Sequence, residues 1–383
     1  MIPYGRQSID AADVEAVVEV LRSDFLTQGP AVPRFEQTIA SYCGAAHGVA
    51  MCNATAALHA ACLALKLGPG DLLWTSPITF VASANCARYC GADVDFVDID
   101  PGTCNMSVER LTEKLEQADR QGRLPKIVIP VHLAGQSAQM REIAELARRY
   151  GFRVIEDASH AIGAEYADGR VGSCRNSDIT VFSFHPVKII TTGEGGMAMT
   201  NDAELARRMA RLRSHGISRE PSDFRHEPEG AWYYEQLELG HNYRMTEIQA
   251  ALGTSQMSRI DACVARRREL ARCYDEAFAE APLTRPWQHP ETRSSAHLYI
   301  ARVDASVRQR LFEGLRDAGI GVNVHYIPVP GQPYYRDLGF DPADWPEAQL
   351  YYAEAITLPL FPDLRDEEQD MVIAAVKRLL ECV

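Results

Sequence analysis

The sequence predicts an α/β fold with a mostly parallel sheet, followed by a smaller α+β unit. Amphipathic helices alternate with short apolar strands from residue 10 to about residue 200, which is the pattern of a parallel sheet with crossover helices. After Pro282 the order changes to strand, helix, strand, a loop rich in proline and tyrosine, and two closing helices. With 383 residues and 46% hydrophobic content, the chain is long enough for one large domain and a smaller one.

The first half of the chain carries clear helix signals. A helix is predicted over residues 10–21, before the break at Gln28-Gly29-Pro30. A second helix begins near Asn53, which has N-cap chemistry, and ends where Gly68-Pro69-Gly70 stops it. A third helix is predicted over residues 138–150.

The strands of this half are five apolar runs. They cover residues 93–99, 126–133, 152–156, 179–184 and 197–200. Because helices separate several of these runs, we expect most of the strands to be parallel and to end at one edge of the sheet.

The second half begins with a helix after Asn201-Asp202 and a turn-rich, aromatic segment over residues 215–243. A helical stretch over residues 246–279 then leads away from the sheet. The last part is predicted to contain strands at 298–303 and 321–327 around a helix at 306–318. We therefore expect a large domain over 1–245, a connecting long helix over 246–281 and a small C-terminal domain over 282–383.

Composition excludes several classes of protein. The formal net charge of -13 and the absence of a lysine and arginine block argue against a nucleic-acid partner. No window approaches the roughly 20 apolar residues of a membrane span, and the start MIPYGRQSID lacks the apolar run of a signal peptide. The sequence thus predicts a soluble protein of the cytoplasm that has no membrane partner.

The ten cysteines are scattered along a chain without export features, which indicates reduced core residues and no disulfide framework. Cys86 and Cys90 are four residues apart on a predicted helix and could share a metal ion. No CxxC pair or neighbouring histidine supports that alternative, so we expect no metal site.

Asn53, Ala54 and Thr55 open a predicted helix. Free backbone N–H groups and the positive end of the helix dipole favour a phosphate there, and the Thr55 hydroxyl can add a hydrogen bond. An ordinary capped helix is the alternative, because N-caps of this kind are common.

Phe80 ends the segment Thr75-Ser76-Pro77-Ile78-Thr79-Phe80, which follows a short strand. Its ring could stack on a pyridine face, since aromatic pairs favour offset contacts. Taken alone, Phe80 fits a core position better than a ligand contact.

Asp157 follows the apolar run at 152–156, at the edge where open α/β sheets bind ligands. Its carboxylate could pair with a protonated pyridinium nitrogen and so sustain an electron sink. His160, three residues later, could bond a phenolic oxygen of the same group or lie on the rim. An acid that only caps the next element is the alternative.

Lys188 lies just past the turn His185-Pro186 that leaves the strand at 179–184. Burial and a nearby cation would lower its pKa and favour an imine, and Ser183 could bind a phosphate. Most lysines are solvated, so the residue alone is weak evidence. Gly193-Glu194-Gly195-Gly196 is interpreted as a tight turn that lets the next strand pass close to Lys188, and only weakly as a phosphate cradle.

Together these segments supply the parts of a site for pyridoxal 5'-phosphate (PLP), held as a Schiff base on Lys188. Each part has an ordinary structural alternative. Their combination in one predicted domain carries the hypothesis.

The same residues resemble the sugar aminotransferases of the DegT/DnrJ/EryC1/StrS family over nearly the whole chain. The similarity rests on blocks in the family's order: SDFLTQGP, NATAALH, TSPITFVASANC, EDASHA, FSFHPVK, TTGEGGM, LRSHG and LGHNYRM. It implies PLP fold type I, with a mostly parallel seven-stranded sheet in the large domain.

The resemblance also implies roles for single residues. These are the Schiff-base lysine Lys188, the pyridinium partner Asp157, the stacking ring Phe80, the cofactor contacts Ala54 and His160, the phosphate ligands Thr55 and Ser183, and Asn242 of the partner subunit at the phosphate. The last role implies an obligate homodimer with shared active sites. Many members have glutamine where this chain has His160.

Within the family, EDASHA, FSFHPVK and IPYGRQSID look most like the branch that acts in pseudaminic acid biosynthesis. That resemblance implies transfer of the amino group of L-glutamate, through pyridoxamine 5'-phosphate, to C4 of UDP-2-acetamido-2,6-dideoxy-β-L-arabino-hex-4-ulose, with release of 2-oxoglutarate. His215, His325 and Tyr326 are candidates for lining the sugar pocket. The alternatives are another 4-keto-6-deoxy sugar linked to UDP, dTDP or GDP, and a non-catalytic nucleotide-sugar-binding regulator on the same fold.

Overall fold

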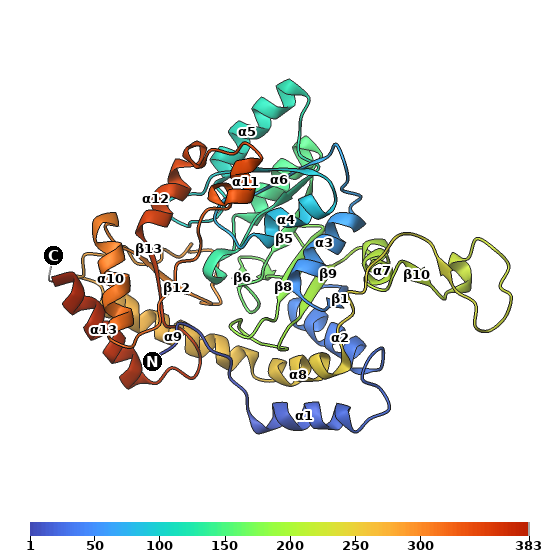
Figure 1. Ribbon diagram of the computed structural model, residues 1–383, viewed down its shortest axis with the longest axis horizontal. Coiled ribbons are helices and arrows are strands. Elements are labelled where there is room, and N and C mark those ends of the chain that lie inside the picture. The colour runs from blue at the N-terminus through green and yellow to red at the C-terminus, as the bar shows by residue number, and fades with distance from the viewer. Residues whose placement is uncertain (382–383) are drawn as a thin grey trace.

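A seven-stranded sheet forms the centre of the protein in a computed structural model that describes residues 1–381 (Figure 1). The strands lie in the order β1 (His47–Met51), β9 (Gly196–Thr200), β8 (Ile179–Ser183), β5 (Arg153–Asp157), β4 (Ile127–Ile129), β2 (Leu72–Thr75) and β3 (Asp93–Phe96). Only β9 runs against its neighbours, because it pairs antiparallel with both β1 and β8. The fold is therefore the predicted α/β class with a mostly parallel sheet.

Helices cover both faces of this sheet. They are α2 (Ala31–Cys43), α3 (Ala54–Ala64), α4 (Ala82–Tyr89), α5 (Val108–Gln121), α6 (Met140–Tyr150) and α7 (Ala203–Leu212). Successive strand residues point to opposite faces, so Ile129 and Ile155 pack with the core under α3, α4 and α7, whereas Val128 and Val154 pack under α5 and α6. Both faces are apolar, as expected for buried parallel strands.

The structure confirms most of the predicted elements of the first half. Helix α1 (Ala11–Leu21) is capped by the Asp10 side chain, and α3 is capped by Asn53. The five predicted strands are present as β3, β4, β5, β8 and β9, and the first two are shorter than expected. Among the helices of this half and the strands of the central sheet, those that were not predicted are α2, β1 and α5.

The expected connecting helix consists of two helices. Thr246 caps α8 (Glu247–Met257), and α9 (Ile260–Ala277) starts after a break at Ser258 and Arg259. Helix α8 packs against α1 and α2 at the base of the large unit, and α9 continues into the C-terminal unit (Figure 1).

The C-terminal unit packs helices against a two-stranded antiparallel sheet, β12 (Tyr299–Arg302) with β13 (Ala355–Leu358). Its helices are α10 (Ala305–Asp317), α11 (Pro333–Asp337), α12 (Pro346–Glu354) and α13 (Asp366–Glu381). The strand predicted over 321–327 is wrong, because this segment forms only a single bridge from Asn323 to Thr357. Val322 supplies the apolar signal by packing in the core, after which the chain turns toward the large unit.

The N-terminal residues pack with the C-terminal unit. Ile2 bridges to Ile320 and belongs to the apolar cluster of α9, α10 and α13, and the Tyr4 carbonyl accepts a hydrogen bond from the Leu360 amide. We therefore propose the domain division at 1–245, 246–281 and 282–383 with the first few residues attached to the last unit.

One segment projects from the body on the side away from the C-terminal unit (Figure 1). This arm, residues 217–239, is held at its base by β10 (Ile217–Ser218) and β11 (Glu235–Gln236). Trp232 and Leu239 are 73% and 80% exposed, which leaves large apolar side chains without cover in a single chain.

Short elements complete the fold. They are β6 (Glu165–Tyr166), β7 (Gly169–Arg170) and the 3-10 turns η1 (Leu133–Gly135), η2 (Pro221–Asp223), η3 (Val329–Gly331) and η4 (Pro342–Asp344). Within the described residues, no helix combines the length and apolar character that crossing a membrane requires.

Candidate active site

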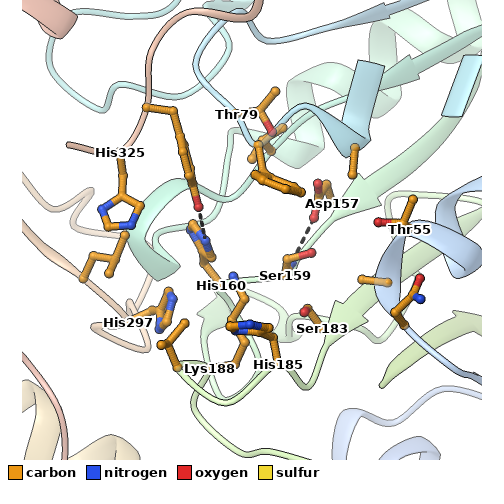
Figure 2. Close-up of a pocket in the computed structure, with 18 of the residues that line it drawn as sticks. Thr55, Thr79, Asp157, Ser159, His160, Ser183, His185, Lys188, His297 and His325 are labelled. Atoms are coloured by element: carbon orange, nitrogen blue, oxygen red, sulfur yellow. Dashed lines mark hydrogen bonds between the residues drawn. The ribbon is translucent and has the colours of Figure 1, made fainter. Parts of the chain in front are cut away.

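A cavity of about 560 Å³ opens where β5 and β8 end, between the large and C-terminal units. Nine of the residues predicted from the sequence line it: Ala54, Thr55, Phe80, Asp157, His160, Ser183, Lys188, His325 and Tyr326. Figure 2 shows Thr55, Asp157 and Ser183 on one side and His297 and His325 on the other, with His160 and Lys188 between them. Parallel strands place their carboxyl ends at one edge, which explains why distant segments converge here.

The start of α3 forms one wall of the cavity. The Asn53 side chain accepts a hydrogen bond from the Ala56 amide at 2.8 Å, whereas the amides of Ala54 and Thr55 belong to the first helical turn, which has no partners within a helix. Gly196 of β9 passes directly behind, and a Cβ there would come within 2.5 Å of the Asn53 carbonyl carbon. A side chain at Gly196 would displace the helix start, so the glycine keeps this anion-binding wall in place.

Asp157 presents its carboxylate to the cavity from the end of β5. Oδ1 accepts a hydrogen bond from the Ser159 amide at 3.0 Å, and Oδ2 accepts one from the Ser83 hydroxyl at 2.6 Å. The Ser83 hydroxyl has a single proton, so Thr79, 2.7 Å away, donates to it in turn. These buried donors fix the direction of the carboxylate.

Ser83→Ala is expected to weaken PLP binding by about 10-fold to 100-fold, because the carboxylate loses one charge-assisted hydrogen bond of roughly 1.5–3 kcal/mol. Equilibrium dialysis or quenching of tryptophan fluorescence measures the dissociation constant. Thr79→Val is the matched variant, since it leaves the bond from Ser83 to Asp157 in place and should cost less. A larger loss in Thr79→Val than in Ser83→Ala would refute this order.

Glu156, the other acid of the pair, points away from the cavity into the opposite layer. It is fully buried and accepts hydrogen bonds from His132 Nε2 at 2.7 Å, Thr180 Oγ1 at 2.9 Å and the hydroxyls of Tyr166 and Ser177. Burial alone would raise the pKa of Glu156, but these donors, His132 foremost, hold it below its usual value. The network anchors β5 and so determines which of the two acids faces the cavity.

Lys188 lies on the turn between β8 and β9, where its amide donates to the His185 carbonyl at 2.9 Å. The side chain is half-buried in the wall of the cavity. Burial lowers the pKa of Lys188 from 10.5 to about 8, against the opposing attraction of the Asp157 carboxylate. A neutral amine is therefore accessible near physiological pH, as nucleophilic and basic chemistry requires.

The pH dependence of PLP uptake follows from this shift. Because only the neutral amine attacks an aldehyde, the rate should rise with pH up to about 8 and level off above it, well before the ordinary 10.5 of lysine. Stopped-flow absorbance on the cofactor-free protein between about pH 6 and pH 10 measures it. A rate that keeps rising through about pH 10 would contradict the depressed pKa.

Three histidines surround the lysine. His160, His297 and His325 are all buried, and the rings of His160 and His297 lie 4.5 Å apart. Burial and then the nearby Lys188 lower the pKa of His325 to about 4; burial first, and then their charged neighbours, hold the pKa values of His160 and His297 well below the usual range. These rings are neutral at physiological pH and serve as hydrogen-bonding groups without charge.

Phe80 is 58% exposed and lies on the cavity rim, 6.3 Å between ring centroids from Tyr326. The core position that the sequence alone favoured for it is therefore wrong, because α4 begins just after Phe80 and turns the ring outward. Its face is available to a planar ligand.

Two predicted residues do not line the cavity of their own chain. His215 and Asn242 are exposed at the base of the arm, where the His215 amide donates to the His241 carbonyl and Asn242 forms a bridge with Ser214. His215 does not line the cavity of its own chain, and its role at the sugar pocket stays a prediction. The role of Asn242 of the partner subunit stays a prediction.

Sequence reasoning missed several lining residues. Tyr4, His185 and His297 line the cavity, and Ser83 lies behind Asp157. Thr79 and Ser83 had a local signal, since they are four residues apart at the start of a helix. Tyr4 and His297 had none, because Tyr4 comes from the N-terminal segment and His297 from the segment just before β12 in the C-terminal unit.

Cys86 and Cys90 belong to α4 and its C-cap. Among the residues described by the structure, no group of three or more histidine, cysteine or acidic side chains is arranged to hold a metal ion.

The arrangement fits PLP. A phosphate, a pyridine nitrogen and an aldehyde require an anion cradle, a carboxylate and an amine, and the start of α3, Asp157 and Lys188 supply them around one cavity.

Comparison with known proteins supports the same interpretation of the site. Residues 7–377 match the model of the DegT/DnrJ/EryC1/StrS aminotransferase family. The spore coat polysaccharide biosynthesis protein SpsC of Bacillus subtilis is 39% identical over 387 residues, covering 99% of this chain and 97% of SpsC.

Solved structures are similar over the whole chain. The putative sugar aminotransferase Spr1654 of Streptococcus pneumoniae in its PMP form has a TM-score of 0.91 at 31% identity, with 100% of both chains covered. The same protein is also known in a PLP form, with a TM-score of 0.90. Helicobacter pylori PseC, described as an aminotransferase involved in the biosynthesis of pseudoaminic acid, has a TM-score of 0.90 at 31% identity, with 100% of both chains covered.

Proposed function

The chain belongs to the DegT/DnrJ/EryC1/StrS aminotransferase family, whose cofactor is PLP, and from this membership we propose that it aminates C4 of a UDP-linked 4-keto-6-deoxy-N-acetylhexosamine. The proposed acceptor is UDP-2-acetamido-2,6-dideoxy-β-L-arabino-hex-4-ulose, and the amino donor is L-glutamate. One observation carries the activity: Lys188, with a pKa lowered to about 8, shares a cavity with Asp157 at the edge of the sheet.

Lys188 is proposed to act on protons in both half-reactions. PLP, when bound, supplies an electron sink that stabilises negative charge on a carbon next to its imine nitrogen. Once free of the cofactor, the neutral amine of Lys188 can take the α-proton of L-glutamate. It can later deliver a proton to one face of the sugar C4, because the turn between β8 and β9 holds it on one side of the cavity.

Asp157 is proposed to hold the proton on the pyridine nitrogen. Its two hydrogen bonds come from donors behind and beside it, so the remaining lone pairs of Oδ1 and Oδ2 stay available to the cavity. The carboxylate thus supplies both charge and direction.

The histidine side of the cavity is proposed to receive the sugar. His325 and Tyr326 reach it from the segment that bridges to β13, and the uncharged rings suit the uncharged hexulose ring, whose hydroxyl, keto and acetamido groups can form hydrogen bonds. The likeness to PseC supports the pseudaminic acid step. The second candidate is another 4-keto-6-deoxy nucleotide sugar, and the 39% identity to SpsC, a spore coat polysaccharide biosynthesis protein, supports a role outside the pseudaminic acid step.

A panel assay distinguishes the two candidates. The protein is incubated with L-glutamate, PLP and 4-keto sugars linked to UDP, dTDP or GDP, and 2-oxoglutarate and the amino sugar are quantified. We expect turnover with the UDP-N-acetylhexulose. Turnover confined to a dTDP or GDP sugar would replace the proposed substrate, and no turnover with any sugar would favour a binding protein.

We also propose that two chains share their active sites. The exposed Trp232 and Leu239 of the arm are large apolar side chains that a partner surface would cover, and the exposed Asn242 at the base of the arm is proposed to enter the partner's cavity. Mixing the variants Lys188→Ala and Asn242→Ala under subunit exchange tests this. In a hybrid dimer one site carries both defects and the other neither, so activity should recover; no recovery would reject shared sites.

A further inference from the structure

His160 is held between two hydrogen-bonding partners. Its Nδ1 accepts a hydrogen bond from the Ala134 amide at 3.3 Å, and its Nε2 lies 3.0 Å from the Tyr326 hydroxyl (dashed line at His160 in Figure 2). The residue is only 6% exposed. Both ring nitrogens are thus occupied by the protein, which leaves none for a direct bond to the cofactor.

The backbone around His160 fixes this arrangement. Ala134 lies in η1 with a φ of 58°, and its carbonyl accepts a hydrogen bond from the His297 amide at 2.9 Å. The His160 carbonyl accepts one from the Ser295 hydroxyl at 2.8 Å. These two hydrogen bonds hold the backbone of Ala134 and of His160, and so keep the Ala134 amide directed at Nδ1.

The directions of these bonds follow from chemistry. A backbone amide can only donate, so Nδ1 must be the unprotonated nitrogen of the ring. Burial first, and then the neighbouring Lys188, holds the pKa of His160 well below its usual value, so the ring is neutral and its one proton is on Nε2. His160 consequently donates to the Tyr326 oxygen, and Tyr326 does not donate to His160.

The Tyr326 proton is then free for another acceptor. Burial, followed by the charge of Asp157, raises the pKa of Tyr326, so the phenol keeps its proton. Among the described residues, His160 is the only hydrogen-bond partner of this hydroxyl, and Tyr326 lines the cavity. The open direction of the O–H bond is toward a ligand.

We propose that Tyr326 is the hydroxyl donor of this cavity, directed at an acceptor oxygen of the ligand, and that His160 is a positioning residue that sets the direction of that bond. The acceptor is either the phenolic oxygen of PLP or an oxygen of the sugar substrate. This replaces the expectation that His160 itself contacts the cofactor. The inference rests on the proposed function for the ligand, whereas the bond directions within the protein stand without it.

The first test measures the protonation of His160 and needs no sugar substrate. Long-range ¹H–¹⁵N correlation spectra of the full-length protein, labelled on histidine nitrogens and recorded with and without PLP, report the tautomer of His160. We expect a neutral ring with the proton on Nε2 near neutral pH, with the signals assigned by their loss in His160→Gln. A proton on Nδ1, or a charged ring, would overturn the proposal whether or not the enzyme aminates any sugar.

The second test reverses the direction of the hydrogen bond between residue 160 and Tyr326. In His160→Gln the amide oxygen can accept from Ala134 and the NH₂ group can donate to Tyr326. The PLP dissociation constant and the kinetic constants of this variant should therefore stay near those of the wild type. In His160→Glu the carboxylate only accepts, so it captures the Tyr326 proton and should match Tyr326→Phe. We expect about a tenfold loss in the latter two, the value of one hydrogen bond.

Two measurements identify the acceptor. A weaker PLP dissociation constant and a shifted visible spectrum assign the phenolic oxygen of the cofactor. An unchanged dissociation constant with a higher KM or a lower kcat for the sugar half-reaction assigns a substrate oxygen. Wild-type values for Tyr326→Phe in both measurements would overturn the proposal.

The new charge in His160→Glu is controlled by a double-mutant cycle. If the substitution acts through Tyr326, it should add little to Tyr326→Phe. Additive losses would show that His160 acts on its own and would reject the positioning role. Should His160→Glu fail to fold, the spectra and Tyr326→Phe still decide the question.

Discussion

Lys188→Ala is expected to abolish turnover, with a loss of at least about 10,000-fold, because one amine serves both as the covalent anchor and as the acid and base of each half-reaction. The same variant should lose the attachment of PLP that borohydride makes permanent. The chain has five lysines, at positions 66, 114, 126, 188 and 377, so peptide mapping after reduction assigns the attachment site without ambiguity.

Lys377→Ala provides the matched control. This lysine is exposed on α13 in the C-terminal unit, far along the chain from the cavity, and its loss should leave activity and attachment unchanged. If PLP remained covalently attached in Lys188→Ala, the assignment of the anchor would be wrong.

Asp157→Asn is expected to lower kcat about 1,000-fold while the borohydride-sensitive linkage to Lys188 is kept. The substitution preserves the shape of the side chain but removes the charge that holds the pyridine proton, and an uncompensated partner of a buried ion pair costs roughly 3–5 kcal/mol. Rapid-quench kinetics of the L-glutamate half-reaction and mass spectrometry of the reduced protein measure the two effects.

Asp317→Asn, at the exposed end of α10, is the control and should behave as the wild type. A near wild-type kcat in Asp157→Asn would show that charge at this position is not needed. Loss of the covalent linkage as well would mean that the substitution disturbs the whole edge of β5, since Asp157 lies between Ser83 and Ser159 in the hydrogen-bond network.

Local chemistry explains which elements could be predicted. The caps at Asp10, Asn53 and Thr246 are encoded within a few residues, and each begins a helix where the sequence predicted one. Helix α2 was missed because Pro30 indicates a break, although a proline also suits the start of a helix. The strand predicted at 321–327 is absent because only Asn323 finds a strand partner, whereas Val322 packs in the core.

The residues of the candidate site also fall into those that could be predicted from the sequence and those that could not. Asp157, Ser183 and Lys188 could be brought together from sequence, because strands of one parallel sheet end at one edge. The bond from Ser83 to Asp157 joins residues 74 apart, and that from His160 to Tyr326 joins residues 166 apart. No periodicity encodes such pairs, because they depend on how α4 and the C-terminal unit pack against the sheet.

The docking of the N-terminal residues on the C-terminal unit has a consequence for the biogenesis of the enzyme. Tyr4 and Tyr326 line the same cavity, so the cavity is complete only after both have met. During synthesis, the cavity therefore gains its Tyr326 side only after residue 326 has left the ribosome. PLP that binds the completed fold raises its stability by mass action, so resistance to proteolysis should rise with PLP concentration.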